Sequence, residues 1–272
     1  MSVNSNEKPV SPEHLAYLKK IKQKKLAVRI TQIAVLVLLL ALWEVAANLK
    51  WIDSFITSQP SRILSTLKRL SETGELYRHI SVTLYETIIG FILGTILGTA
   101  IAIILWWSDF IARVADPYLV VLNSLPKVAL GPIIIVWMGA GTLAIVTMAL
   151  LISVIVTVIA VLNGFLEVSP DKIKLMKTFG ATKMQILTKV VLPASIPTII
   201  SALKINVGMS WVGVIVGEFL VSKAGLGYLA VYGGQVFQLD LVMTSVVILL
   251  VSAAIMYKGV AWLEKRYMKW RR

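Results

Sequence analysis

The sequence predicts an all-α, polytopic membrane protein with six transmembrane helices, and composition and charge pattern are the first evidence. Of 272 residues, 57% are hydrophobic and 15% are charged, whereas soluble domains carry about 25% charged residues. The charges are also segregated, because residues 128–166 contain no Asp, Glu, Lys, Arg or His. One span needs roughly 20 apolar residues. This run is too long for one helix of a soluble core, and it holds two spans with a turn between them.

The basic residues predict how the spans are oriented. The net charge is +13, and the basic residues gather in three groups, at positions 19–29, 172–189 and 265–272. Basic segments beside apolar spans mark the cytoplasmic side of a membrane, and anionic lipid headgroups attract them. Both termini are therefore expected in the cytoplasm, which requires an even number of spans. A nucleic-acid-binding protein would carry a basic stripe on a soluble fold, so we expect a lipid bilayer and no nucleic acid as partner.

The chain divides into a polar lead-in and a transmembrane domain. Residues 1–29 predict a cytoplasmic, basic amphipathic helix on the membrane surface, and a solvated run of charges is an equal alternative. Residues 30–272 form the transmembrane domain. Its spans are expected at about residues 30–49, 80–107, 116–138, 142–165, 195–221 and 241–262. Pro126 and Pro132 predict that the third span is kinked or broken, because proline removes a helix hydrogen bond.

The second span carries a pattern for helix packing and an acidic residue. Gly90, Gly94 and Gly98 recur every four residues, a spacing of small residues that lets another helix approach closely. Glu86 lies in the same span, and Glu44 lies in the first span. We expect both carboxylates near the outer boundary, hydrated or paired with Arg or Lys, because an unpaired charge inside the bilayer is costly.

The basic loop at residues 167–193 is more than a simple connector. Apolar residues recur at helical spacing before and after Gly180, which predicts two short amphipathic helices joined at that glycine. Pro193 is expected to end the second helix or to bend it into the fifth span. A cytoplasmic helical hairpin with an apolar ridge can dock into a groove of a partner protein.

The spacing of this loop resembles the EAA loop in the permease subunits of binding-protein-dependent ABC importers. The pattern of that family is Glu-Ala-Ala-x-x-x-Gly-x9-Ile-x-Leu-Pro, and its loop inserts into the ATP-hydrolysing subunit. The matching positions here are Gly180, Val190 (in place of Ile), Leu192 and Pro193. The Glu-Ala-Ala positions depart from the pattern and hold Lys174, Leu175 and Met176. A salt bridge from the family's Glu therefore does not carry over to this chain.

Further motifs extend the resemblance over residues 59–272, which look like the nitrate/sulfonate/taurine class of these permeases. In chain order they are Pro60-Ser61, Asp116-Pro117, Leu125-Pro126, Gly131-Pro132 and Gly225-Leu226-Gly227-Tyr228. Each motif is weak alone, and their common order and spacing carry the resemblance.

The resemblance implies the type I ABC importer permease fold. Two permease subunits would form one pathway in the bacterial cytoplasmic (inner) membrane. A homodimer is expected, and a heterodimer stays open. An extracytoplasmic binding protein would deliver a small solute such as a sulfonate, taurine, nitrate or a related organic compound. Two copies of a separate ATPase would use ATP and Mg, because no Gly-rich phosphate loop followed by Lys and Ser or Thr occurs here. The chain itself would be no enzyme and would bind no cofactor.

The resemblance also implies a set of ATPase-coupling residues in the loop. They are Lys174, Leu175, Met176, Lys177, Phe179, Gly180, Ala181, Val190, Leu192 and Pro193. We expect the hairpin around Gly180 to transmit ATPase closure to the third, fourth and fifth spans.

Polar residues in the third and fifth spans are candidates to line the pathway. They are Asn123, Ser124, Asn206, Ser210, Trp211 and Glu218. For each of them, hydrogen bonding between helices is an equal alternative. No metal site is expected, because cysteine is absent and His14 and His79 lack metal-ligand spacing.

Two other classes of membrane protein compete with the importer. A secondary transporter would have more spans and internal repeats, and it would leave the loop at 167–193 without a role. A membrane-embedded enzyme would need a catalytic constellation, whereas this sequence holds only scattered acids.

Overall fold

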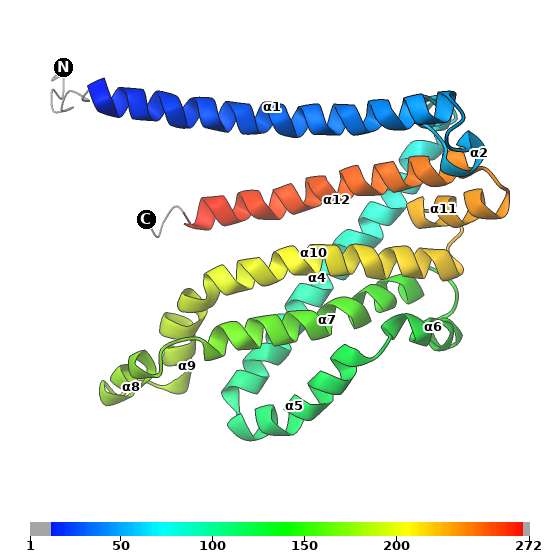
Figure 1. Ribbon diagram of the computed structural model, residues 1–272. Coiled ribbons are helices and arrows are strands. Elements are labelled where there is room, and N and C mark those ends of the chain that lie inside the picture. Colours follow the sequence, from blue (N-terminus) through cyan, green and yellow to red (C-terminus); the bar gives the residue numbers. More distant parts are fainter. Residues whose placement is uncertain (1–11, 269–272) are drawn as a thin grey trace, which may run out of the picture. The chain divides into compact units, whose positions relative to one another are not determined.

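The computed structural model describes residues 12–268, which form helices and no β-strand. Figure 1 shows the elements, which are α1 (Pro12–Asn48), α2 (Ser54–Thr57), α3 (Pro60–Glu72), α4 (Glu75–Trp107), α5 (Asp109–Ser124), a 3-10 turn (Lys127–Leu130), α6 (Gly131–Met138), α7 (Thr142–Leu166), α8 (Pro170–Thr178), α9 (Lys183–Ile186), a π-helical turn (Leu187–Val191), α10 (Leu192–Val221), α11 (Leu226–Gln235) and α12 (Leu239–Met268). The chain divides into two compact units at the boundary between residues 62 and 63.

Within residues 12–268, five helices are long and apolar enough to cross a membrane. They are α1, α4, α7, the continuous helix Lys183–Val221 and α12. A sixth candidate is α5 together with residues 127–138, a pair bent by 86°. An all-α fold with six candidate spans therefore agrees with the fold class that the sequence predicts.

The bend in the third candidate span begins at Pro126. Leu125, which precedes this proline, has an extended ψ of 132°, because the proline ring disfavours the helical conformation of the residue before it. The helix hydrogen bonds therefore stop at this point, and a 3-10 turn leads into α6. The structure also begins this span at Asp109, upstream of the expected residue 116.

In the N-terminal unit, α1 is continuous from Pro12 to Asn48. The helix therefore continues without a break through residue 30, where the sequence predicted a boundary between an amphipathic segment and a span. Residues 1–11 of the predicted amphipathic segment lie outside the described part. The Glu44 carboxylate accepts hydrogen bonds from Ser61 N at 3.0 Å and Ser61 Oγ at 2.8 Å. Glu44 thus caps the start of α3, and it forms no ion pair with any Arg or Lys in the described part of the chain.

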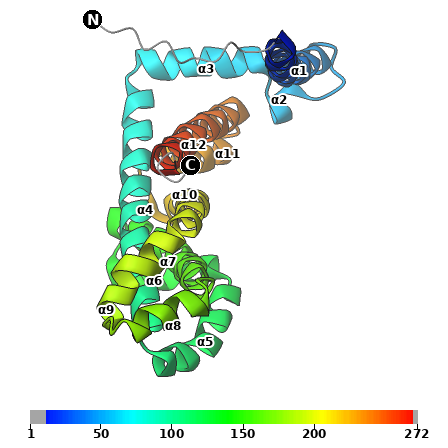
Figure 2. The ribbon, with the colours of Figure 1, turned by 90° about the vertical axis from the view of Figure 1, so that its left-hand side faces the viewer.

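The core of the second unit is the packing of α4, α7 and α10, which run past one another in Figures 1 and 2. Ala149 on α7 is fully buried. A Cβ added at Gly90 on α4 would lie 2.8 Å from Ala149 Cβ, and one added at Gly213 on α10 would lie 2.4 Å from Ala149 Cα. A Cβ at Gly94 or Gly98 would likewise lie 2.4 or 2.6 Å from side chains of α7. Small residues therefore allow three helix backbones to approach closely at this point.

Candidate functional site

The loop at residues 167–193 forms two helices joined by a tight turn. Helix α8 ends at Thr178 with Phe179 as its C-cap, and Gly180 follows with a φ of +72°. Gly180 N donates to Lys177 O and Ala181 N donates to Met176 O, each at 3.0 Å. This is the Schellman arrangement, in which a residue with positive φ closes the last turn of a helix. Glycine adopts that φ without steric cost, so the turn needs Gly180 locally.

Helix α9 is fixed at its start by a capping box. Gln185 N donates to Thr182 Oγ1 at 3.3 Å, and Thr182 N donates to Gln185 Oε1 at 2.8 Å. Two free backbone N–H groups are thereby satisfied. We call the segment from α8 through α9 and the π-helical turn that follows it, residues 170–191, the hairpin. Its turn geometry comes from residues that lie close together in the sequence.

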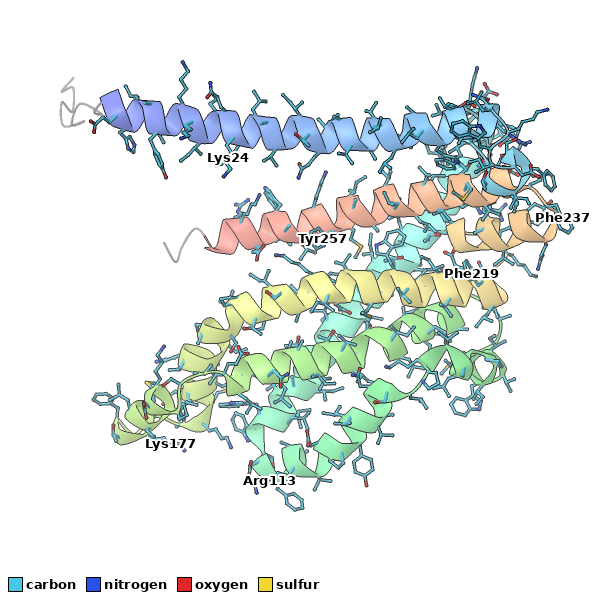
Figure 3. All side chains as sticks on the ribbon, in the orientation of Figure 1. Lys24, Arg113, Lys177, Phe219, Phe237 and Tyr257 are labelled. Carbon is cyan, nitrogen blue, oxygen red and sulfur yellow. The ribbon has the colours of Figure 1, made fainter. Side chains whose placement is uncertain are left out.

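The tip of the hairpin exposes apolar side chains. Leu175 is 57% exposed, Phe179 is 78% exposed and Met184 is 58% exposed. Lys177, labelled in Figure 3, lies on the same segment and is also exposed. The tip of the hairpin thus presents an apolar surface with a lysine beside it.

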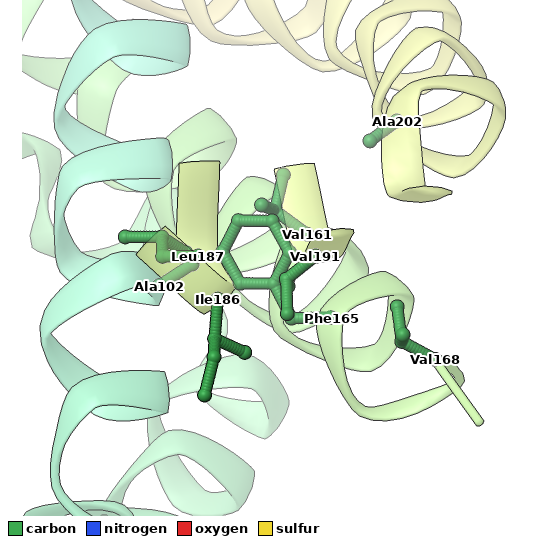
Figure 4. Packing of buried hydrophobic residues seen from close by; sticks show 8 residues of the cluster. All are labelled: Ala102, Val161, Phe165, Val168, Ile186, Leu187, Val191 and Ala202. Carbon is green, nitrogen blue, oxygen red and sulfur yellow. The ribbon is translucent and has the colours of Figure 1, made fainter. Parts of the chain in front are cut away.

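The root of the hairpin is buried in the core of the second unit, as the close view in Figure 4 shows. Ile186, Leu187 and Val191 are 0–4% exposed. They form a cluster with Ala102 of α4, Val161 and Phe165 of α7, Val168, and Ala202 of α10. A π-helical turn at Leu187–Val191 connects the root to α10. The tip is therefore linked through packed side chains to all three core helices.

A further contact ties the hairpin to α4. Lys183 Nζ donates to the backbone oxygen of Trp107, the last residue of α4. The same ammonium lies 5.6 Å from the centre of the Trp107 ring, within the range of a cation–π interaction. The sequence motif did not indicate this contact, because residues 107 and 183 are far apart in the chain.

The predicted loop residues fall into two groups in the structure. Those exposed to solvent are Lys174, Leu175, Lys177, Phe179, Gly180 and Pro193. Those half-buried against the core are Met176, Ala181, Val190 and Leu192. Lys174 pairs with Asp171 within α8 at 3.8 Å. Pro193 does not end the second helix, because it lies in the first turn of α10.

A second group of polar residues lies at the other end of α10, around Glu218. Thr83 Oγ1 of α4 donates to Glu218 Oε1 at 2.6 Å, and Gly227 N of α11 donates to Glu218 Oε2 at 2.6 Å. Thr83 Oγ1 also accepts a hydrogen bond from Leu226 N at 2.7 Å. We call these residues, together with His79 and Gly225, the Glu218 cluster. Glu218 and Thr83 thus satisfy the free N–H groups at the start of α11, as N-terminal caps do.

His79 and Gly225 complete the Glu218 cluster. Gly225 N donates to His79 Nδ1 at 2.9 Å. Gly225 has a φ of +120°, and a Cβ there would lie 2.3 Å from Glu218 Cδ. The loop therefore closes over the carboxylate only because Gly225 has no side chain. His79 itself is only 6% exposed.

Glu86 lies beside Glu218 and is 1% exposed. Its Oε2 atom has no hydrogen-bond partner among the described residues. The expectation of a hydrated carboxylate, or one paired with Arg or Lys, was therefore wrong for Glu86. The error arose because distance from a span end does not reveal which helix face a residue occupies.

The six predicted pathway residues do not come together in one place. Asn206, Ser210, Trp211 and Glu218 of α10 are each at most 4% exposed. Asn206 Nδ2 donates to Thr95 Oγ1 of α4 at 2.8 Å, which corresponds to the alternative of bonding between helices. Asn123 and Ser124 instead lie exposed at the end of α5. In this conformation, the four residues of α10 face the interior of the chain.

Up to six candidate spans among the described residues, with an exposed apolar hairpin between α7 and α10, are typical of a membrane transport subunit. The chain belongs to the family of binding-protein-dependent transport system inner membrane components, which it matches over residues 90–269. It is thus a permease subunit of an ABC importer. The prediction of this family from the EAA-like loop is confirmed.

Two relatives and one solved structure illustrate the match. A probable ABC transporter permease protein of Haemophilus influenzae is 31% identical, over 85% of this chain and 93% of that protein. A putative aliphatic sulfonates transport permease protein, SsuC, of Bacillus subtilis is 28% identical, over 86% of this chain and 84% of that one. A chain of the inward-facing MetNI methionine ABC transporter superposes with a TM-score of 0.63 at 21% identity, covering 70% of this chain and 95% of its own. The type I importer fold is therefore confirmed.

Proposed function

We propose that two copies of this chain form the pathway for a small solute, and that ATP hydrolysis in a separate subunit drives transport. An extracytoplasmic binding protein delivers the solute, and two ATPase copies bind below the permease pair. The observation that carries this proposal is the hairpin, whose exposed tip and buried root are joined within one short segment.

The exposed tip supports docking to an ATPase. Burying one large apolar side chain contributes about 1.5–3 kcal/mol, and Leu175, Phe179 and Met184 are each more than half exposed. Such side chains fit an apolar groove on a partner as anchors. Lysines around the tip at positions 172, 174 and 177 add attraction to an acidic rim.

The buried root supports the transmission of movement. Cores are close-packed and deform little, so a displaced element moves its neighbours with it. Ile186, Leu187 and Val191 contact α4, α7 and α10 together. A partner that closes on the tip therefore moves the three core helices as one body, and it biases the permease between two conformations.

The charge pattern supports one orientation in the membrane. The lysine-rich hairpin lies in the cytoplasm with both termini. Helix α10 has 30 residues and is about 45 Å long, enough to cross a hydrocarbon core of roughly 30 Å. Helix α11, at the far end of α10, lies on the outer side and faces the binding protein.

The solute is proposed to be a sulfonate, taurine, nitrate or a related small organic compound. The name of the Bacillus subtilis relative supports a sulfonate. The methionine transporter has the same fold, so the fold alone does not select the solute. Asn123 and Ser124 on α5 remain pathway candidates because their side chains are exposed.

The test is reconstitution of the permease in nanodiscs with its ATPase and binding protein. Ligand-stimulated ATP hydrolysis is compared between Phe179→Ser and Phe237→Ser. Phe237 is a matched control, because it is 72% exposed and lies beyond α11 (Figure 3). We expect Phe179→Ser to weaken ATPase association by roughly ten-fold or more and Phe237→Ser to leave it unchanged. Equal hydrolysis by both variants would overturn the proposal.

A further inference from the structure

A pocket of about 410 Å³ lies in the second unit between α3, α4, α11 and the start of α12. Its volume falls within the range of small-molecule sites. The floor includes the buried residues Leu70, Leu229 and Leu241. The rim is polar and includes Arg69, Arg78 and Lys223. Nothing in the transport mechanism proposed above uses this pocket.

Three cations lie at this rim, and they outnumber the acidic residues that line the pocket. Arg69, Arg78 and Lys223 form no salt bridge with any described residue. Arg113 on α5, by contrast, is paired with Asp109 of the same helix at 2.9 Å. Glu75 is the one acidic residue among those that line the pocket. The pocket therefore has an excess of positive charge, which attracts an anion.

A buried hydrogen-bond donor also lines the pocket. The His79 ring is 6% exposed, and its Nδ1 accepts the hydrogen bond from Gly225 N. In a neutral imidazole the other nitrogen, Nε2, must then carry the hydrogen. No described acceptor takes this hydrogen. A donor held in the wall of a cationic pocket favours a ligand with an anionic oxygen.

The remaining walls suit a flat, apolar body. The rings of His79 and Tyr228 stack with centroids 5.9 Å apart, and the rings of Tyr228 and Tyr232 stack at the same distance. Together they form an aromatic wall above the leucine floor. Aromatic surfaces of this kind pack well against planar organic groups.

We propose that this pocket binds a small organic anion, with its carboxylate or related head group at Arg69, Arg78 and His79 and its body along the tyrosine wall. His79 also accepts the hydrogen bond from Gly225, next to the start of α11. A bound anion would therefore connect α3 and α4 to α11 and hold α11 in place. This site does not depend on transport, so its test is separate from that of the proposed function.

The test is equilibrium binding of radiolabelled benzoate to the purified chain in phosphatidylcholine nanodiscs. Benzamide, which has the same shape and no charge, is the matched ligand. We expect saturable benzoate binding and at least ten-fold weaker competition by benzamide, because the charge-assisted bonds are lost. Comparable binding of the two ligands, or no benzoate binding, would overturn the proposal.

Variants locate the binding site. We expect Arg78→Gln and Arg69→Gln each to weaken benzoate binding about ten-fold. Arg113→Gln, which removes an exposed arginine distant from the pocket, should change it less than two-fold. Both rim arginines are exposed, so these variants are expected to fold, and gel filtration checks that they do. Unchanged binding in both rim variants would contradict the assigned site.

The lipid composition distinguishes two sources of the anion. When phosphatidylglycerol is added to the nanodiscs, a site that takes a lipid head group will bind benzoate at least ten-fold more weakly. A site that takes a dissolved anion will bind benzoate equally in both lipids. Either result supports an anion site, provided that Arg78→Gln weakens benzoate binding about ten-fold or removes the lipid effect. A lipid effect that persists in Arg78→Gln would contradict the proposal.

Discussion

The two ends of α10 are fastened to the rest of the molecule by different physical means. The hairpin at the N-terminal end is shaped by local turns and held by apolar packing at its root. The Glu218 cluster at the C-terminal end is held by buried hydrogen bonds between residues 135 to 146 positions apart. Close apolar packing passes a displacement on to its neighbours without requiring particular bond angles, whereas buried hydrogen bonds require fixed geometry. The hairpin end is thus suited to accept a moving partner, and the α11 end is suited to stay fixed.

Among these substitutions, Glu218→Ala is expected to cause the largest loss of stability. This substitution leaves the buried Gly227 N–H without its acceptor, and the Thr83 hydroxyl keeps only the longer bond to His79 O at 3.2 Å. An unsatisfied buried group costs about 1–3 kcal/mol, and the loss of the short bond to Thr83 adds to this cost. We expect the free energy of unfolding to fall by about 3 kcal/mol, measured by denaturation in mild detergent. Glu72→Ala is the control, because Glu72 is 66% exposed and pairs only with Lys68. Similar losses from both substitutions would show that the Glu218 cluster does not hold α11.

A smaller effect is expected from Gly225→Ala. The new Cβ would lie 2.3 Å from Glu218 Cδ, and the φ of +120° is strained for alanine. We expect a loss of about 2 kcal/mol, from overpacking and backbone strain together, measured as a lower melting temperature. Gly234→Ala, also in the α11 region, has nothing within 4 Å of its added Cβ and should change stability by less than about 1 kcal/mol.

The smallest effect on stability is expected from Gly180→Ala in the hairpin. Its φ of +72° is unfavourable for alanine, but nothing lies within 4 Å of the added Cβ. We expect a cost of about 1 kcal/mol from the backbone alone. Gly139→Ala is matched to it, with a φ of +78° and equally open surroundings.

The two glycines differ in what their substitution does to the complex. Gly180→Ala should reduce co-purification of the ATPase, because it alters the turn that presents Phe179. Gly139→Ala should retain the ATPase in full, despite a similar change in melting temperature. If both variants lost the ATPase, the loss would be due to general instability, and the hairpin would have no specific role in ATPase binding.

The same contrast explains what the sequence could and could not predict. The hairpin was predictable because Gly180 and the apolar residues around it are neighbours in the chain, and local periodicity is visible in a sequence. The Glu218 cluster was not, because Glu218, Thr83 and His79 come together only through the packing of α4, α10 and α11. The glycines in the motif Gly225-Leu226-Gly227 indicated that the backbone approaches another group closely, but they did not indicate that this group is the Glu218 carboxylate.

The second limit of prediction from the sequence was the direction in which each face of a helix points. The α4 glycines were read as packing positions, and they lie against α7. Within the same helix, Glu86 was placed at a hydrated boundary, whereas it faces the interior. In α10, Asn206 contacts α4 through Thr95. A nearly uniform apolar span has little amphipathic pattern, so its sequence does not distinguish the inward face from the outward one.

The most direct test of the central claim is site-specific crosslinking, which the absence of cysteine in this chain makes clean. Phe179→Cys and Phe237→Cys each introduce one exposed thiol, at the hairpin tip and beyond α11. The assembled importer is treated with a maleimide–succinimide reagent and examined for permease–ATPase adducts. Docking of the tip predicts an ATPase adduct from position 179 and none from position 237. An ATPase adduct from position 237 alone, or equal adducts from both, would contradict the account.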